Sequence, residues 1–177
     1  MKYENVFTLL EEITIQYGEK VSLGMKSKWG WNEFTYKGLG LLSRRLASYI
    51  INDLQVEKGE KLAILSESKP EYGACVFGSV LAGLTTVPLD NKLTIYELDS
   101  ILSNCQPAIL LCSSANIERA KELQSRISSI KHIILMDPSV YEDIKIPSLF
   151  SIPETYNAKW RRRPLSSTAF IIYTSGT

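Results

Sequence analysis

Between Leu62 and Met136 the sequence alternates short, predominantly apolar runs with longer amphipathic stretches. The apolar runs cover residues 62–65, 85–89, 108–112 and 132–136. Runs without polar alternation are typical of strands covered on both faces, as in a parallel sheet. Their starts recur about every 23 residues, the length of a strand plus a crossover helix. This pattern predicts an α/β fold with a doubly wound, mostly parallel sheet and flanking helices.

The stretches between the runs carry helix start and stop signals. Ser68 with Glu71, and Thr94 with Glu97, fit the capping box, in which a hydroxyl and a carboxylate satisfy amides at the start of a helix. We expect the helix opened at Ser68 to end near Gly83, because glycine tolerates a left-handed terminus. A third stretch has an apolar helical face at Ile117, Ala120, Leu123 and Ile127.

The part before residue 61 predicts a helix over 6–17, a strand over 20–25 that continues into a hairpin, and a longer helix from Thr35. We expect Trp29 and Trp31 of the hairpin to cover the edge of the core. The longer helix has a polar face that we expect to be solvated. That face comprises Lys37, Arg44, Arg45 and Asn52.

Composition narrows the class of protein. The chain has 177 residues, 19.9 kDa, a formal charge of +1, 45% hydrophobic and 22% charged residues, which excludes a disordered chain or a nucleic-acid-binding polyelectrolyte. Cys75, Cys105 and Cys112 lack metal-site spacing, so free thiols are expected and no metal site. There is no signal-peptide pattern and no apolar run of the roughly 18 residues that a membrane span needs. These features predict a soluble, cytoplasmic protein.

The last residues carry the pattern that most indicates a ligand-binding site. We expect 169–173 to be a buried strand, and Thr174, Ser175, Gly176 and Thr177 follow it directly. Hydroxyls and a turning glycine backbone suit phosphate, although a plain solvent loop has the same composition. Neither the Walker nor the dinucleotide-binding fingerprint is present.

For three other candidate functional sites, a structural role is favoured. Arg161, Arg162 and Arg163 suit a phosphate, but an exposed linker turn is the more common use of such a run. His132 opens an apolar strand and is expected to pack at its end. Asp90 follows the second apolar run, where a turn-forming role is favoured over a ligand role.

Together these residues resemble the adenylate-forming enzymes, which include AMP-forming acyl-CoA synthetases. Residues 170–177 are similar to the opening of the family's phosphate loop, Y-T-S-G-[ST]-T-G-x-P-K-G. Residues 80–90 resemble its L-x-A-G-x-x-x-V-P-L-D segment, 34–39 its F-T-Y-x-E-L block and 59–65 its G-D-x-V-A-I strand. The blocks occur in the family's order over essentially the whole chain. The segment Pro88–Leu98 looks most like the long-chain fatty acyl-CoA ligase branch.

The resemblance implies an ATP-dependent ligase that joins a fatty acid to CoA and releases AMP and pyrophosphate. Thr174, Ser175, Gly176 and Thr177 would contact the ATP phosphates, and no residue of this chain is implied as catalytic. Residues 1–165 would form an N-terminal α/β subdomain, and 166–177 a strand with the start of the phosphate loop. The resemblance thus implies a parent enzyme using ATP, Mg²⁺ and CoA, and a fragment that is inactive alone, binds none of them tightly and self-associates.

Two alternatives stay open from the sequence. The chain could be a non-catalytic α/β module that binds a partner, or one half of a split enzyme completed by a second polypeptide. The coding sequence after residue 177 and the mass of the native protein discriminate among these possibilities.

Overall fold

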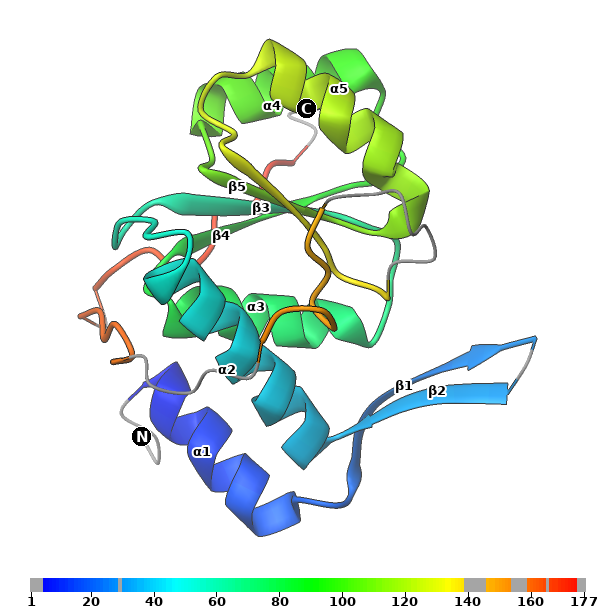
Figure 1. Ribbon diagram of the computed structural model, residues 1–177, viewed down its shortest axis with the longest axis vertical. Helices are drawn as coiled ribbons and strands as arrows, with labels where there is room; N and C mark the ends of the chain where they lie inside the picture. The colour runs from blue at the N-terminus through cyan, green and yellow to red at the C-terminus, as the bar shows by residue number, and fades with distance from the viewer. Residues whose placement is uncertain (1–4, 29, 139–145, 154–158, 165, 175–177) are drawn as a thin grey trace.

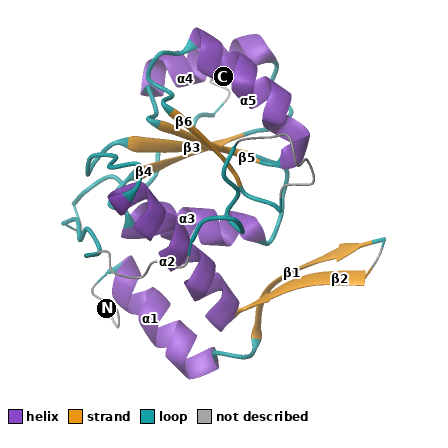
Figure 2. Ribbon diagram, in the orientation of Figure 1, coloured by secondary structure: helices purple, strands orange, loops and turns teal. Residues whose placement is uncertain are grey.

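The computed structural model describes residues 5–28, 30–138, 146–153, 159–164 and 166–174. A central parallel sheet lies between two helical layers, and a two-stranded hairpin projects from one side (Figures 1 and 2). The elements follow in the order α1 (Val6–Tyr17), β1 (Val21–Ser27), β2 (Gly30–Thr35), α2 (Tyr36–Asn52), β3 (Lys61–Leu65), α3 (Glu71–Leu81), β4 (Thr85–Leu89), α4 (Ile95–Cys105), β5 (Ile109–Cys112), the 3₁₀ turn η1 (Ser114–Asn116), α5 (Ile117–Arg126) and β6 (His132–Leu135).

The predicted doubly wound sheet is confirmed. Its strands are parallel and run in the order β4-β3-β5-β6. Helices α2 and α3 cover one face, α4 and α5 cover the other, and α1 packs on α2 and α3 (Figure 1). Among the described helices, none has both the length and the apolar composition that a membrane crossing requires.

The apolar strands owe their pattern to these two layers. In β3, Leu62 and Ile64 point into the core shared with α2 and α3, whereas Ala63 and Leu65 point into the core shared with α4 and α5. All four side chains are fully buried. A strand buried on both faces has no solvent side on which a polar residue is favoured.

The helix signals are confirmed at two positions and wrong at one. Thr94 and Glu97 form the predicted capping box at the start of α4, and α3 ends before Gly83, which has a left-handed φ of +76°. Ser68, however, caps nothing, because α3 begins only at Glu71. The carbonyls of Lys69 and Pro70 accept the first amide hydrogen bonds there, at 3.1 and 3.3 Å.

The predicted hairpin is confirmed, but the expected position of its tryptophan is wrong. Strands β1 and β2 pair antiparallel and extend away from the sheet (Figure 2). Trp31 is 65% exposed and covers no core, because the hairpin projects beyond the helices. Trp29 lies outside the described residues.

The polar face of α2 is only partly solvated. Lys37 and Asn52 are exposed as expected and Arg44 is intermediate, but Arg45 is buried. Its Nη1 donates to the carbonyl of Phe150 at 3.3 Å. The chain that follows β6 therefore folds back over this part of α2, which the helical periodicity alone does not predict.

Candidate functional site

The segment that leads to the predicted phosphate residues lies at the outer edge of the sheet, beside β4. Its pairing is parallel and limited to one bridge between Thr86 and Phe170. The Thr86 amide donates to the carbonyl of Ala169 at 2.9 Å, and the Ile171 amide donates to the carbonyl of Thr86 at 3.0 Å. The next residue of β4 on this side is Pro88, which has no N–H to continue the ladder.

The expectation of a buried strand over 169–173 is therefore wrong. Phe170 and Ile172 are 42% and 70% exposed, whereas Ile171 and Tyr173 pack against the core beneath α4 and α5. Only one side of the segment is covered in the described part of the chain. An edge position accounts for both the broken pairing and the exposure.

Tyr173 fixes the end of this segment to the helical layer. Its hydroxyl donates to Oδ1 of Asn104 in α4 at 2.5 Å. Thr174 follows and is exposed. Ser175, Gly176 and Thr177 lie outside the described residues.

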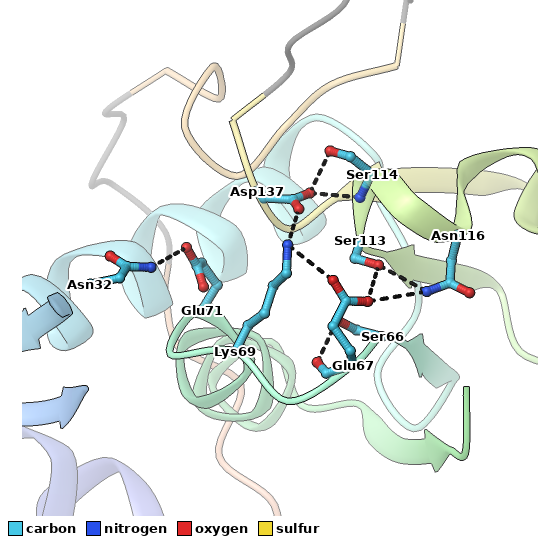
Figure 3. A network of polar contacts seen from close by, with 9 residues as sticks. All are labelled: Asn32, Ser66, Glu67, Lys69, Glu71, Ser113, Ser114, Asn116 and Asp137. Atoms are coloured by element: carbon cyan, nitrogen blue, oxygen red, sulfur yellow. Dashed lines mark hydrogen bonds and ion pairs between the residues drawn. The ribbon is translucent and has the colours of Figure 1, made fainter. Parts of the chain in front are cut away.

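A network of polar side chains occupies the carboxyl edge at the centre of the sheet (Figure 3). Lys69 bridges Glu67, at 3.2 Å, and Asp137, with which it forms a still closer pair. Asp137 Oδ1 accepts from the amide and hydroxyl of Ser114 at 2.8 and 2.9 Å, and Glu67 Oε2 accepts from the hydroxyl of Ser113 at 2.7 Å. Residues after β3, β5 and β6 are thereby joined.

This polar network fills the topological switch point of the sheet. The chain runs from β3 to β4 on one side and returns to β5 on the other, so a crevice is expected outside the carboxyl ends of β3 and β5. Glu67 follows β3 and Ser113 follows β5, and their side chains are hydrogen-bonded to each other. The protein's own charges occupy the place where a doubly wound sheet commonly binds a ligand.

The charged forms of Glu67 and Lys69 are both stabilised in this network. Burial alone raises the pKa of Glu67, but the hydrogen bond from Ser113 and the ammonium of Lys69 outweigh it, so the pKa is lowered. Burial alone lowers the pKa of Lys69, but Asp137 and Glu67 outweigh it, so the pKa is raised. Lys69 is thus held as a cation by protein carboxylates and is already partnered.

An open pocket of about 510 Å³ borders the network on the side of β4. Its lining includes Ser66, Lys69, Tyr72 and Asp90. Asp90 has the turn-forming role expected from the sequence, since its Oδ1 accepts from the Lys92 amide at 2.9 Å. The pocket gives a polar molecule room at the carboxyl edge, between the network and the end of β4.

The other candidates behave as structural residues. His132 begins β6 as expected, and burial followed by the charge of Lys131 lowers its pKa. The three cysteines are free and buried; burial raises the pKa of Cys112 to about 12. Within the described ranges, no three His, Cys, Asp or Glu side chains gather as metal ligands would.

The three arginines lie near the amino-terminal end of β4. Arg163 Nη1 donates to Oγ1 of Thr85 at 3.0 Å and to the carbonyl of Thr168 at 2.9 Å. Arg161 donates to the carbonyl of Val56. The expected exposed turn is therefore correct only for Arg162, because the other two are partly buried.

Comparison with known proteins shows to which family the whole chain is similar. The sequence profile of the AMP-binding enzyme family matches residues 11–177. A crotonobetaine/carnitine–CoA ligase of Escherichia coli O1:K1 is 29% identical over 172 residues, which are 94% of this chain and 33% of that protein. The chain thus spans about a third of the length of the curated relatives it matches.

Solved structures agree on the fold. Coronafacic acid ligase from Pectobacterium brasiliense superposes with a TM-score of 0.81 at 16% identity, over 96% of this chain and 33% of that one. ATP-bound MatB from Rhodopseudomonas palustris gives a TM-score of 0.73 at 20% identity, over 97% and 32%. With the profile match over nearly all of its residues, this chain belongs to the AMP-binding enzyme family.

Proposed function

We propose that this chain is part of an ATP-dependent, AMP-forming acid–thiol ligase. In such a reaction a carboxylate attacks the α-phosphate of ATP, pyrophosphate leaves, and the thiol of CoA then displaces AMP from the acyl-adenylate. The family match over residues 11–177 supports this proposal, as do curated relatives named as CoA ligases. The observation that carries it is Thr174, which is exposed directly after a segment that pairs parallel with β4 and resembles the opening of the family's phosphate loop.

Within this function, Thr174, Ser175, Gly176 and Thr177 would bind the outer phosphates of ATP. Hydroxyls donate hydrogen bonds to phosphate oxygens, and a glycine lets consecutive amides turn toward an anion. None of the four is a nucleophile or a base, so their contribution is to hold a polyanion in place while charge develops on pyrophosphate. Mg²⁺ and CoA would complete the reaction in the whole enzyme.

The acid is proposed to be a fatty acid and the enzyme to be cytoplasmic. Support for the acid comes from the resemblance of Pro88–Leu98 to the long-chain branch. The E. coli relative, in contrast, is named for crotonobetaine and carnitine, so an acid panel must contain both classes. A greater exchange rate with carnitine than with any fatty acid would overturn the fatty-acid assignment and leave the ligase proposal intact.

An ATP–pyrophosphate exchange assay tests the proposed reaction. We expect no exchange from the 177-residue chain alone, because it spans 33% of its relative, and exchange once the remainder is supplied in one polypeptide or in trans. Thr174→Ala in the completed enzyme is expected to lower the rate about 100-fold, as for loss of one phosphate donor. Ser166→Ala, which removes an exposed hydroxyl of the same part of the chain, is the matched control.

The outcomes separate the two parts of the proposal. A completed enzyme that exchanges pyrophosphate with no acid is not a ligase of this kind. If the completed enzyme is active and Thr174→Ala does not change its rate, the proposed reaction stands and the proposed contact between Thr174 and phosphate is wrong. Robust turnover by the 177-residue chain would overturn its expected inactivity.

A further inference from the structure

A small apolar hollow lies at the amino-terminal end of β4. It is bounded by the start of α1, the end of α3 and residues 160–164 and 167–169, and its volume is about 160 Å³. Its apolar lining includes Phe7, Val80, Leu84 and Trp160. Trp160 also packs against the main core, so this wall is held by the folded protein.

The rim of the hollow is basic. Arg161, Arg162 and Arg163 line it, and Lys58 donates to the carbonyl of Arg162 at 2.6 Å. In the described part of the chain, none of these four cations pairs with a carboxylate, whereas such pairs occur elsewhere in the fold, for example at Lys69 and Arg126. A cluster of cations without acids at close range attracts an anion.

Arg162 is the cation best placed for a ligand. Arg161 and Arg163 are held by protein oxygens, whereas the guanidinium of Arg162 lies over the ring of Phe7, at 5.5 Å from its centroid. Its side chain is exposed and makes no hydrogen bond to the described residues. The cation–π contact holds the guanidinium at the mouth of the hollow, where no described residue accepts a hydrogen bond from it, and its planar donors match a carboxylate.

We propose that this hollow binds a small aromatic carboxylate. A cavity of about 150 Å³ lined by apolar side chains takes up benzene in another protein, so a volume of about 160 Å³ suits one six-membered ring. The aromatic side chains of Phe7 and Trp160 offer edges and faces to such a ring. The planar guanidinium of Arg162 matches a carboxylate at the mouth. The proposal is independent of the ligase function, because none of the residues that line the hollow belongs to the segment 170–174.

A titration of the full chain with benzoate, followed by ¹H–¹⁵N NMR, tests the site. We expect saturable shifts that cluster at Phe7, Val80 and Leu84, and weaker binding of benzyl alcohol, its neutral analogue. Arg162→Gln is expected to weaken benzoate about tenfold, as for loss of a charge-assisted contact, without affecting benzyl alcohol. Lys26→Gln, which removes an exposed cation of β1, is the control and should change neither affinity.

A second variant tests the hollow by filling it. Val80→Phe places a ring where the ligand ring would lie, and circular dichroism checks that the variant is folded. It should abolish the binding of both compounds. Scattered or non-saturable shifts, equal affinity for benzoate and benzyl alcohol, or an Arg162→Gln variant with unchanged affinity would each overturn the proposal. Tighter binding of phenyl phosphate than of benzoate would overturn the choice of carboxylate.

Discussion

The hydroxyl of Tyr173 donates a hydrogen bond to Oδ1 of Asn104 at 2.5 Å, between residues 69 positions apart in the chain. This bond holds the residue before Thr174 against α4. The pairing of the same segment with β4 is limited to the bridge at Phe170. The position of Thr174 therefore depends on a side chain of the helical layer as well as on the sheet.

Replacing Tyr173 by phenylalanine should weaken this attachment. The ring keeps its packing and loses one hydrogen bond, so we expect a loss of about 1 kcal/mol in the free energy of unfolding. Urea denaturation measures the loss, and hydrogen exchange of the Ile171 amide should become faster. Tyr96→Phe is the matched control, because Tyr96 is 75% exposed. Equal effects of the two substitutions would show that the bond to Asn104 does not hold the segment.

Pro88→Val should extend the pairing between β4 and the segment 169–173. Pro88 stands two residues after Thr86, on the side that faces the segment. A valine supplies the missing N–H, which is in register with the carbonyl of Ile171. We expect the new amide to be protected in hydrogen exchange. Exchange at the rate of an open loop would mean that something other than the proline ends the pairing.

Lys69→Met should destabilise the carboxyl edge of the sheet. The substitution keeps the side-chain length but leaves Glu67 and Asp137 without their shared cation. Because the Lys69 side chain is 21% exposed, we expect a loss of about 2 kcal/mol, below that of a fully buried pair. Lys121→Met, which breaks an exposed pair with Glu118, should cost at most about 0.5 kcal/mol. Urea midpoints of the two variants provide the comparison.

The network should also make stability depend on pH. The folded-state pKa of Glu67 lies below its ordinary value of 4.5, so its contribution is complete above that pH and disappears as the pH falls through the folded-state pKa. The pKa of Lys69 is raised above 10.5, so its contribution is lost only at higher pH. Unfolding measured between about pH 7 and 3 should show a smaller acid loss in Glu67→Gln than in the wild type. Identical profiles would contradict the assigned pKa direction.

Gly83→Ala should destabilise the protein more than Gly59→Ala. Both glycines have a left-handed φ, +76° and +93°, but a Cβ at Gly83 would lie 2.8 Å from Cβ of Arg161, whereas at Gly59 nothing lies within 4 Å. The backbone strain of about 1 kcal/mol is common to both. The difference between their free energies of unfolding thus measures the contact with Arg161. No difference would mean that the segment carrying Arg161 moves away without cost.

The strands and the start of α4 could be predicted because each has a local sequence signal. A strand with two covered faces is an apolar run, and the capping box of Thr94 and Glu97 spans four residues. The capping box predicted at Ser68 was wrong. Ser68 and Glu71 have the required spacing, but Pro70 is the N-cap residue and α3 begins only at Glu71. The apolar run at 169–173 was expected to be buried, because such a run has no polar residue to mark an exposed side. Pro88 was the one available signal, as a proline within a strand indicates an edge.

The charged network could not be predicted in the same way. Glu67 and Ser113 are 46 residues apart, and Lys69 and Asp137 are 68 apart. No periodicity relates them, and each residue alone is typical of a solvated loop. They meet because parallel strands bring the loops that follow them to one edge. The burial of Arg45 has the same origin, since its partner Phe150 lies 105 residues away.

The ion pairs at the switch point decide what the carboxyl ends of β3 and β6 contribute to the molecule. Because Lys69 is paired with Glu67 and Asp137, an anion that approached its ammonium group would compete with two protein carboxylates. The loops that follow β3 and β6 are thereby tied to each other, and the carboxyl edge of the sheet is organised by the protein's own charges.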